Sequence, residues 1–503
     1  MARSVELESP KESGYAISRG GGTRVRLLVR LGSEICTKSS RTRYRFIGIL
    51  VRNMRRALRS AGLRGRIRPG RSRVLVDTET PVAVRNTLVR VFGVRSVAGV
   101  VEIPFESLEE LVGRACRLFR DRVAGRTFAV RTRRRRQSPF TSQDLDRELG
   151  AALLPFSAGV DLDAPEVEVQ VEVFDGYAFA VMDEASGSDG LPLGTGGRVV
   201  ALFSGGFDSP VATWQTMRRG AYPELLLCDL GGYGQPDQTL SVARELALRW
   251  APGHNIRAHV VDLAPVVSAL GRRVDPRLRQ ILLKRVMYRA GSFLAQEVGA
   301  EALLTGESLS QVSTQTLRNL AVAERAADLP ILRPLIGTGK EEVIGLARRI
   351  GTYDASATVR EHCSIAAGPV ETWAEPDEVL TAEGELAYEV DEAWIRRAVE
   401  RRRIVQLRSW VPQKSGTPSH VVEHVPEGAV VVDVREPGEG PQVGDLRLPF
   451  SRAMEALDRL DKSRTYLLVC ASGQRSEILA RRLLERGYSA RSLSGGVSRL
   501  AGG

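Results

Sequence analysis

The chain contains 503 residues, which at roughly 150 residues per domain predicts three or four domains. Hydrophobic residues make up 43% and charged residues 26% of the sequence, a balance that excludes an intrinsically disordered chain. The net charge is +12, but residues 1–150 alone hold 33 basic and 14 acidic side chains. A strongly basic N-terminal part joined to a nearly neutral remainder indicates a module that binds a polyanion.

The cysteine pattern and the N-terminus indicate the compartment. Five cysteines lie far apart without a Cys-x-x-Cys pair, which argues against a disulfide framework and against a zinc site. The polar N-terminus lacks the apolar core of a signal peptide, and no apolar run approaches the roughly 18 residues of a membrane span. We therefore expect a cytoplasmic protein without membrane association.

The basic N-terminal part alternates strand and helix patterns. Residues 1–23 are polar, without periodicity, and predict a disordered leader. Apolar spacing then predicts strands near 25–30, 73–76 and 97–103 and helices at 44–60, 81–92 and 108–120. The strand FAVRTRRRR, a capped helix at TSQDLDRELG and the alternating strands VEVQVEVF and YAFAVMD follow. Two small α+β units account for this order, and we assign them to residues 24–77 and 78–184.

The remainder predicts two further domains. After a glycine-rich linker at 187–197, the wholly apolar strand VVALF is of the kind buried on both faces of a parallel sheet. LLLCDL, AHVVDL and ALLTG then alternate with helical stretches, which predicts an open parallel α/β sheet over 195–390. A long charged helix is expected from Asp391 to Trp410, within a helix and linker segment at 391–417. A small α/β domain at 418–503 follows.

A glycine-rich hexapeptide, Ser204-Gly205-Gly206-Phe207-Asp208-Ser209, comes directly after the VVALF strand and before a predicted helix. Glycines let the backbone approach an anion, and the start of a helix offers unpaired N–H groups and the positive end of the helix dipole. Asp208 is suited to hold Mg²⁺ rather than phosphate. Because the loop lacks the lysine of a Walker motif, a purely structural turn stays as the alternative to a phosphate site.

A second loop, Val-Cys-Ala-Ser-Gly-Gln-Arg-Ser at 469–476, also lies between a predicted buried strand and a helix. A cysteine at a helix N-terminus is expected to have a lowered pKa, and Arg475 adds positive charge. Four residues separate Cys470 from Arg475, one fewer than in cysteine phosphatases, and this tighter ring favours a persulfide over a phosphate. A buried structural thiol is the alternative.

Several segments together resemble the tRNA 4-thiouridine synthetase family. The hexapeptide resembles the loop of N-type ATP pyrophosphatases, and LLKRVMYRA, TGESLSQVSTQTLRNL and LRPLIGTGKEEVIGLARRIGTYD resemble this family in particular. The stretch from VVVDVREPGE to LSGGVSRL resembles a rhodanese domain, with Asp433 and Arg435 in its DVRE motif.

The resemblance implies a multidomain α+β and α/β fold. It consists of a ferredoxin-like domain (24–77), a THUMP RNA-binding domain (78–184), an adenine nucleotide α hydrolase-like ATP pyrophosphatase domain (195–390) and a rhodanese-like domain (418–503).

The resemblance also implies site residues. Asp208 would organise Mg²⁺ and pyrophosphate, and no tightly bound metal is expected. Lys340 would contact phosphate or tRNA, and Lys284, which taken alone would be a solvated helix charge, would contact ATP. The other implied tRNA contacts are Arg131, Arg133 and Arg134. The implied ATP contacts are Leu202, Phe203, Ser204, Gly205, Gly206, Asp208, Ser209, Lys284, Gly306 and Gln315.

The implied reaction makes 4-thiouridine between the acceptor and D stems of tRNA. ATP adenylates the uridine O4, the persulfide on Cys470 attacks C4, and Cys363 then forms a redox-active disulfide with Cys470 as the thiolated base is released. Without the resemblance, Cys363 would be inert packing.

Implied partners are tRNA, a cysteine desulfurase as sulfur donor, a thiol reductant and a sulfur-carrier protein for thiamine thiazole synthesis; a homodimer is allowed. The alternatives are an ATP-dependent ligating or amidating enzyme and a non-catalytic tRNA-binding protein.

Overall fold

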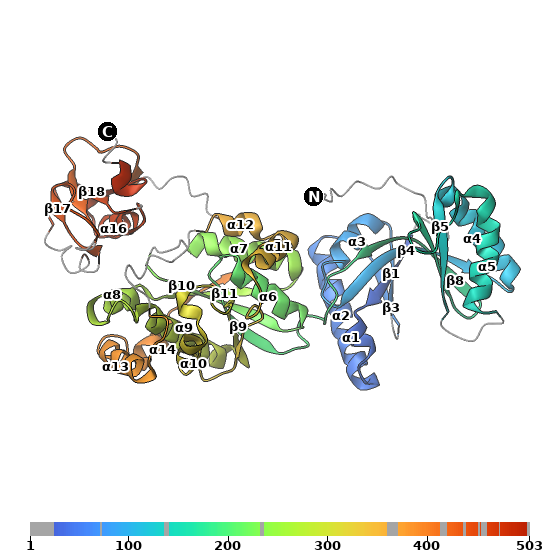
Figure 1. Cartoon of the computed structure of the whole chain (residues 1–503), viewed down its shortest axis with the longest axis horizontal. Helices are drawn as coiled ribbons and strands as arrows, with labels where there is room; N and C mark the ends of the chain where they lie inside the picture. The colour runs from blue at the N-terminus through green and yellow to red at the C-terminus, as the bar shows by residue number, and fades with distance from the viewer. Residues whose placement is uncertain are drawn as a thin grey trace. The chain divides into compact units, whose positions relative to one another are not determined.

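The computed structural model describes residues 25–70, 73–134, 140–231, 236–359, 371–412, 420–435, 439–450, 453, 460–471 and 473–499 (Figure 1). The chain divides into two compact units, 1–195 with 252–254 and 196–251 with 255–503. The expected leader at 1–23 and Cys363 lie outside the described residues. Within the described ranges, no helix is both long and apolar enough to cross a lipid bilayer.

One eight-stranded sheet runs through the first unit, in the order β2-β3-β1-β4-β8-β7-β5-β6 (Figure 1). The long strand β4 pairs antiparallel with β1 on one side and with β8 on the other. The two expected α+β units therefore share a continuous sheet. Its strands are β1 (Val25–Leu31), β2 (Arg66–Pro69), β3 (Arg73–Thr78), β4 (Val94–Pro104), β5 (Thr127–Arg134), β6 (Gly159–Val160), β7 (Val167–Val173) and β8 (Tyr177–Ser186).

Amphipathic helices bury two separate cores against this sheet. The helix expected at 44–60 is present as α2 and begins four residues earlier, and it buries Phe46, Leu50, Met54 and Leu58 as their spacing predicts. The helix at TSQDLDRELG carries a capping box between Thr141 and Asp144. The helices are α1 (Ser33–Cys36), α2 (Ser40–Ser60), α3 (Pro81–Leu88), α4 (Leu108–Val123) and α5 (Ser142–Leu153).

The second unit begins with a six-stranded sheet in the order β13-β12-β9-β10-β11-β14. The apolar strand β9 lies in its middle, paired in parallel with β12 and β10. Five of the six strands are parallel, as the βαβ pattern predicts. The strands are β9 (Arg198–Leu202), β10 (Tyr222–Asp229), β11 (Arg257–Asp262), β12 (Ala302–Leu304), β13 (Ile331–Leu332) and β14 (Arg403–Gln406).

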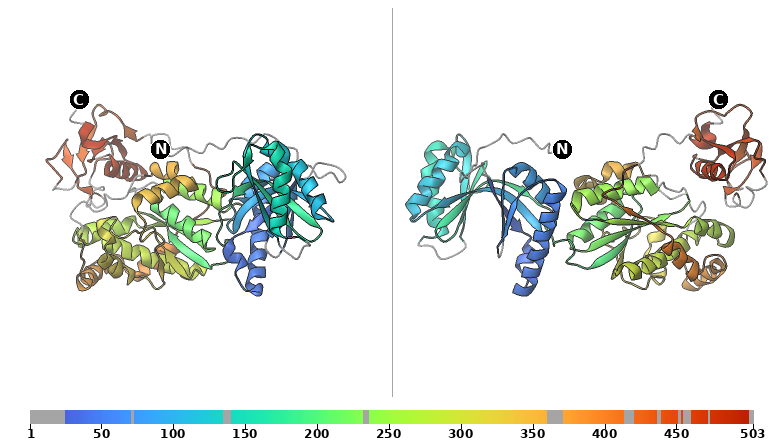
Figure 2. Two further views of the ribbon diagram at one scale, coloured as in Figure 1. Left: turned by 45° about the vertical axis from the view of Figure 1, so that its right-hand side comes forward. Right: turned by 180° about the vertical axis from the view of Figure 1, so that it is seen from behind.

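Two groups of helices flank the six-stranded sheet, and Figure 2 shows them from two further sides. The helices of one group contact one another: α6 (Asp208–Arg218), α7 (Pro236–Trp250), α11 (Lys340–Ile350) and α12 (Tyr353–Ala357). The other group packs around α9 and forms a large apolar core: α8 (Ala264–Arg273), α9 (Arg279–Val298), α10 (Leu317–Glu324), α13 (Pro376–Ala387) and α14 (Glu392–Glu400).

The single long helix expected from Asp391 to Trp410 is wrong. The helix α14 ends at Glu400, and β14 follows and pairs antiparallel with β11. The physical reason is tertiary, because the edge of β11 offers unpaired backbone groups and the β-branched Ile404 and Val405 suit a strand. Val405 is buried there while Ile404 stays half exposed.

The C-terminal segment forms its own parallel sheet in the order β15-β19-β18-β16-β17, with its own apolar core. The apolar strands VVVDV and TYLLVC are its central pair. The elements are β15 (Val421–Val422), β16 (Val430–Asp433), β17 (Leu446–Arg447), β18 (Thr465–Val469), α16 (Gln474–Glu485) and β19 (Ser489–Leu493).

Candidate active sites

The glycine-rich hexapeptide lies at the carboxyl end of β9, where the chain turns into α6. This edge, beside the middle strands of an open parallel sheet, is where such folds bind ligands. Leu202 ends the strand, and Phe203 continues the pairing through a hydrogen bond from its N–H to the Leu226 carbonyl at 2.8 Å. The loop is thus fixed by the sheet behind it.

Two backbone N–H groups of the loop converge on one oxygen. The N–H groups of Ser204 and Gly205 donate to the Ser209 hydroxyl at 3.1 and 3.3 Å. Gly205 has a φ of +80°, which glycine adopts without strain, and a Cβ there would lie 3.0 Å from Thr239. In this structure the Ser209 hydroxyl takes the place that an anion takes in the phosphate-binding nests formed by successive amides in other proteins.

Gly306 brings a second backbone segment against the start of α6. A Cβ at Gly306 would lie 2.8 Å from both the Asp208 carbonyl carbon and the Ser209 nitrogen. Any larger residue must push the two segments apart. This close approach places the segment after β12 beside the loop Ser204–Ser209, which we call the phosphate loop.

Asp208, at the first position of α6, is contacted by two side chains from that neighbouring region. The Gln311 amide donates to Asp208 Oδ2 at 3.0 Å, and the Lys340 ammonium lies 3.3 Å from both carboxylate oxygens. Asp208 and Lys340 stay partly exposed, at 26% and 40% of their side chains. Because the ion pair leaves both groups open to solvent, each can exchange its partner for a ligand.

Across the described residues, no three His, Cys, Asp or Glu side chains form a metal-binding group. In phosphate sites, Mg²⁺ is commonly held by one or two carboxylates together with substrate phosphates and waters.

A buried cluster of charged side chains lies at the same edge of the six-stranded sheet and is centred on Glu307, the residue after Gly306. Glu307 accepts hydrogen bonds from the Lys284 ammonium at 2.6 Å, from Arg333 at 2.8 Å and from the Tyr288 hydroxyl at 2.8 Å. Burial would raise the pKa of Glu307, but the two cations outweigh burial and lower the pKa to about 2. Lys284 is thus bound to Glu307 in this structure, not exposed on its helix.

Further residues line the outer rim of the phosphate loop. The rings of Phe207 and Tyr353 stack with centroids 5.3 Å apart, and the Lys340 ammonium lies 5.7 Å from the Phe207 centroid. Gln315 turns inward, and its side-chain carbonyl accepts from the Ser308 N–H at 3.3 Å. Gln315 therefore orders the loop that carries Gln311.

The loop that follows β18 encloses the Cys470 thiol. Cys470 directly follows β18 and is 1% exposed. Its Sγ accepts a hydrogen bond from the Gly473 N–H at 3.1 Å and one from the Ser476 hydroxyl at 3.5 Å. Gly473 has a φ of +88°, and this turn aims its N–H back at the sulfur. The arrangement can stabilise a thiolate or a persulfide.

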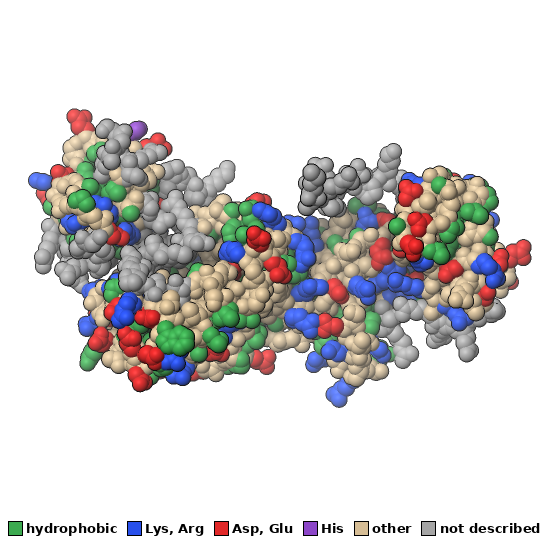
Figure 3. Space-filling model, viewed as in Figure 1, with side chains coloured by type: hydrophobic (Ala, Val, Ile, Leu, Met, Phe, Trp, Pro, Cys, Tyr) green, Lys and Arg blue, Asp and Glu red, His purple; other side chains and the backbone are tan. Residues whose placement is uncertain are grey.

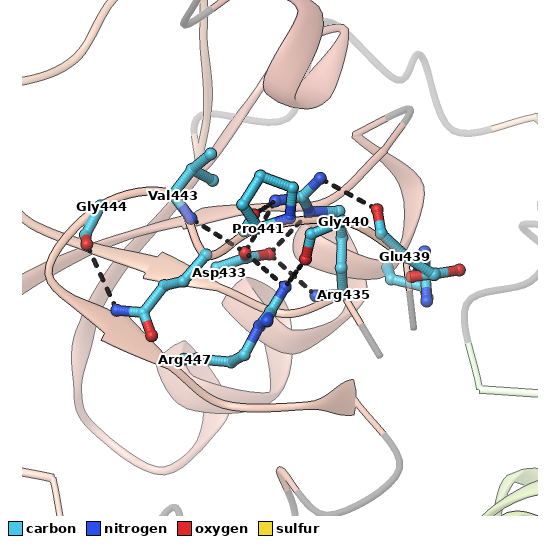
Figure 4. A network of polar contacts seen from close by, with 10 residues as sticks. Asp433, Arg435, Glu439, Gly440, Pro441, Val443, Gly444 and Arg447 are labelled. Carbon is cyan, nitrogen blue, oxygen red and sulfur yellow. Dashed lines mark hydrogen bonds and ion pairs between the residues drawn. The ribbon is translucent and has the colours of Figure 1, made fainter. Parts of the chain in front are cut away.

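A network of arginines and carboxylates adjoins this loop (Figure 4). Arg435 forms a two-pronged contact with the fully buried Asp433, from Nε and from one terminal nitrogen, each at 2.9 Å. Arg447 reaches the same carboxylate at 3.3 Å. Burial raises the pKa of Asp433, but Arg435 and two backbone N–H groups lower it below its ordinary value. The DVRE motif thus holds the turn after β16.

The first unit presents arginines to solvent, and Figure 3 shows blue side chains over its visible face. Arg131, Arg133 and Arg134, on β5, are exposed. Arg131 donates to the Leu162 carbonyl, and Arg134 donates to the Phe140 carbonyl at 2.8 Å.

The solvent face of α2 carries more arginine than β5. Six exposed arginines lie on one side of this helix. At 3.6 residues per turn, their directions around the helix axis fall within roughly 60° of one common direction. We name them the α2 stripe: Arg41, Arg45, Arg52, Arg55, Arg56 and Arg59.

The structure brings together some predicted site residues and separates others. Leu202 to Ser209, Gly306 and Lys340 meet at one edge of the six-stranded sheet, and Lys284 and Gln315 support it. Sequence reasoning missed Glu307 and Gln311, although both stand in TGESLSQVSTQ, because their roles depend on which side chains face Lys284 and Asp208. Cys470, Arg475 and the DVRE pair meet in the C-terminal domain.

Three family models match the chain. The model described as thiamine biosynthesis protein (ThiI) matches residues 194–388, the ThiI ferredoxin-like domain matches 26–98, and the THUMP domain matches 105–182. These matches confirm the expected ferredoxin-like, THUMP and pyrophosphatase-loop domains.

Curated relatives match nearly the whole chain. The tRNA sulfurtransferase of Pyrobaculum aerophilum is 37% identical over 93% of this chain and 96% of its own length. That of Desulfurococcus amylolyticus is 36% identical over 95% and 98%. A probable tRNA sulfurtransferase of Saccharolobus solfataricus is 37% identical over 76% of this chain and all of its own length.

Solved structures of similar fold include a protein of the same activity as these relatives. A 4-thiouridine synthetase, crystallised with RNA and bound ATP, superposes with a TM-score of 0.66 at 27% identity, over 76% of this chain and 99% of that protein. A Pyrococcus horikoshii protein superposes with a TM-score of 0.50 at 25% identity, over 65% and 99%. With such relatives covered over almost their full length, the chain belongs to the tRNA sulfurtransferase family.

Proposed function

We propose that this enzyme uses ATP to convert a tRNA uridine, between the acceptor and D stems, into 4-thiouridine with sulfur carried on Cys470. The observation that supports the proposal is the presence, on one chain, of a glycine turn with convergent amides at Ser204–Ser209 and of an enclosed thiol at Cys470. ATP hydrolysis alone would need only the first loop, and sulfur transfer alone would need only the second. The joint reaction needs both.

The phosphate loop would bind and orient ATP. Its convergent amides suit the phosphates, and Lys340 would leave Asp208 to contact a phosphate oxygen while Asp208 takes part in holding Mg²⁺. Attack of the uridine O4 on the α-phosphate gives an adenylate and pyrophosphate. This step replaces a poor leaving group at C4 by AMP.

The loop that carries Cys470 would then supply the nucleophile. The terminal sulfur of a Cys470 persulfide attacks C4, and AMP leaves with the original O4. Attack by Cys363 on the Cys470 sulfur breaks the remaining sulfur–sulfur bond and leaves a Cys363–Cys470 disulfide, which a thiol reductant reopens. A cysteine desulfurase is the class of enzyme that would load Cys470.

The first unit would hold the tRNA. The α2 stripe runs over 18 residue steps, which at 1.5 Å per residue is about 27 Å, long enough to follow several phosphates of an RNA strand. Arg131, Arg133 and Arg134 add charge on β5. Arginine contacts of this kind supply affinity and register without sequence readout.

The test is the 4-thiouridine content of tRNA in a strain that lacks the gene, measured on thiol-sensitive gels. The wild-type gene should restore the modification, and genes with Asp208→Asn or Cys470→Ala should not. The control variant Cys116→Ala, at a free cysteine of the first unit, should restore it. Normal 4-thiouridine in the deletion strain would refute the proposal.

Sulfur donation to thiamine synthesis is a second candidate function, favoured by the matched family description of a thiamine biosynthesis protein. It would use Cys470 without the phosphate loop, to deliver sulfur to a sulfur-carrier protein. Thiazole auxotrophy in a Cys470→Ala strain, with growth restored by an Asp208→Asn gene, would establish it.

The remaining alternatives are weaker. A ligating or amidating enzyme would have no use for an enclosed cysteine loop. A non-catalytic tRNA-binding protein would have no need to keep both loops intact.

A further inference from the structure

The cations beside Cys470 already have counter-ions within the C-terminal domain. Arg475, the second residue of α16, pairs with the Glu439 carboxylate at 2.7 Å. Arg435 pairs with Asp433, and its guanidinium also donates to the Glu439 carbonyl at 3.3 Å (Figure 4). Glu439 therefore touches both arginines, one through its carboxylate and one through its backbone.

The Glu439–Arg475 pair is largely shielded from water. The side chain of Arg475 is 11% exposed and that of Glu439 is 25% exposed. Since Glu439 is fixed at its backbone by Arg435, its carboxylate is held where an incoming oxyanion would have to bind Arg475. The Glu439 carboxylate takes the Nη2 group of Arg475, an N–H donor that a sulfonate-like oxyanion would also use, so the two compete for it.

We propose that Glu439 determines which sulfur donors Cys470 accepts, by excluding small oxyanions such as thiosulfate and leaving thiol-bound persulfides as donors. This inference rests on the proposed role of Cys470 as sulfur carrier. Glu439 acts in two ways: it occupies Arg475, and its negative charge repels a dianion at short range. A protein persulfide needs no oxyanion site, because its leaving group is a thiolate.

The two donor reactions differ in what leaves. With a persulfide donor, the Cys470 thiolate attacks the outer sulfur, the sulfur–sulfur bond of the donor breaks, and the donor thiolate leaves with the electron pair. With thiosulfate, the same attack releases sulfite, which carries two negative charges. Both give a Cys470 persulfide without net oxidation. Only the second requires a cation to bind the departing oxyanion.

The first test is sulfur transfer from thiosulfate to cyanide by the full-length protein, in which thiocyanate formation restores the Cys470 thiolate. Glu439→Gln should lower the KM for thiosulfate about tenfold relative to wild type, with a smaller change in kcat. Glu427→Gln, at an exposed carboxylate of the same domain, should leave the KM unchanged. A KM for Glu439→Gln within twofold of wild type would overturn the inference.

A second measurement is independent of sulfur transfer. Alkylation of Cys470 by anionic iodoacetate and by neutral iodoacetamide, followed on the Cys470 peptide by mass spectrometry, compares the two charges at one thiol. Glu439→Gln should raise the ratio of the iodoacetate rate to the iodoacetamide rate about tenfold. An unchanged ratio would contradict the inference.

The wild-type protein provides a check that needs no variant. Sulfate should not slow the reaction of Cys470 with iodoacetamide, because Glu439 occupies Arg475; strong protection by sulfate would overturn the inference. If Cys470 takes sulfur from neither a persulfide nor thiosulfate, the carrier role fails, yet the alkylation ratio still decides whether Glu439 excludes anions.

Discussion

At the scale of single residues, Glu307 makes a charge-dependent contribution to stability. Its folded-state pKa of about 2 lies below the ordinary value near 4.3, so its contribution is complete above that value and is lost as the pH falls toward 2. Glu307→Gln leaves Lys284 and Arg333 without their shared carboxylate and should cost about 3–5 kcal/mol at neutral pH.

The pH dependence separates this charge effect from a packing effect. We expect the difference in Tm between wild type and Glu307→Gln, measured by thermal unfolding from pH 7 to pH 3, to become smaller below about pH 5. A Tm difference that stays constant over this pH range would mean that the variant is destabilised by lost packing and not by lost charge.

Gly306 tests the close approach beside the phosphate loop. Gly306→Ala forces backbone atoms 2.8 Å from the new Cβ to move, and we expect ATP affinity to fall at least tenfold. Gly337→Ala is the matched control, because no atom lies within 4 Å of a Cβ there. Isothermal titration with ATP measures both variants, and equal affinities for the two would count against the site geometry.

At the scale of elements, the α2 stripe should govern the salt dependence of tRNA binding. Replacing Arg45, Arg52 and Arg59 by Gln removes up to three phosphate contacts and should reduce the slope of log K against log salt by about 2 to 3. Filter binding across a salt series measures the slope. The same change at three exposed arginines of the second unit, Arg397, Arg401 and Arg408, should leave the slope intact.

The elements also show what sequence patterns predict and what they miss. The helix α2 and the apolar strand β9 were predictable, because their periodicity records burial on one face or on both. The strand β14 was not, since only its pairing with β11 makes the short segment Arg403–Gln406 after α14 a strand. The glycine turn at Ser204–Ser209 follows from the hexapeptide. The roles of Glu307, Gln311 and Glu439 instead depend on partners that lie 23 to 103 residues away in the chain, namely Lys284, Asp208 and Arg475.

At the scale of the whole molecule, the +12 net charge conceals a division between parts. The basic excess lies in the first unit, whereas the phosphate loop and the Cys470 loop lie on separate sheets of the second unit. Binding and sulfur delivery should therefore be separable by mutation. Cys470→Ala should bind ATP and tRNA with wild-type affinity and yet make no 4-thiouridine, measured by equilibrium binding and nucleoside analysis.

If ATP activates the uridine O4 as an adenylate, that oxygen leaves with AMP, and an isotope label can follow it. A tRNA whose uridines carry ¹⁸O at O4 is incubated with the full-length protein, ATP and a persulfide donor, and the AMP is analysed by mass spectrometry. We expect one ¹⁸O atom in AMP for each 4-thiouridine formed. 4-Thiouridine formed with unlabelled AMP, or with ¹⁸O in inorganic phosphate, would contradict it.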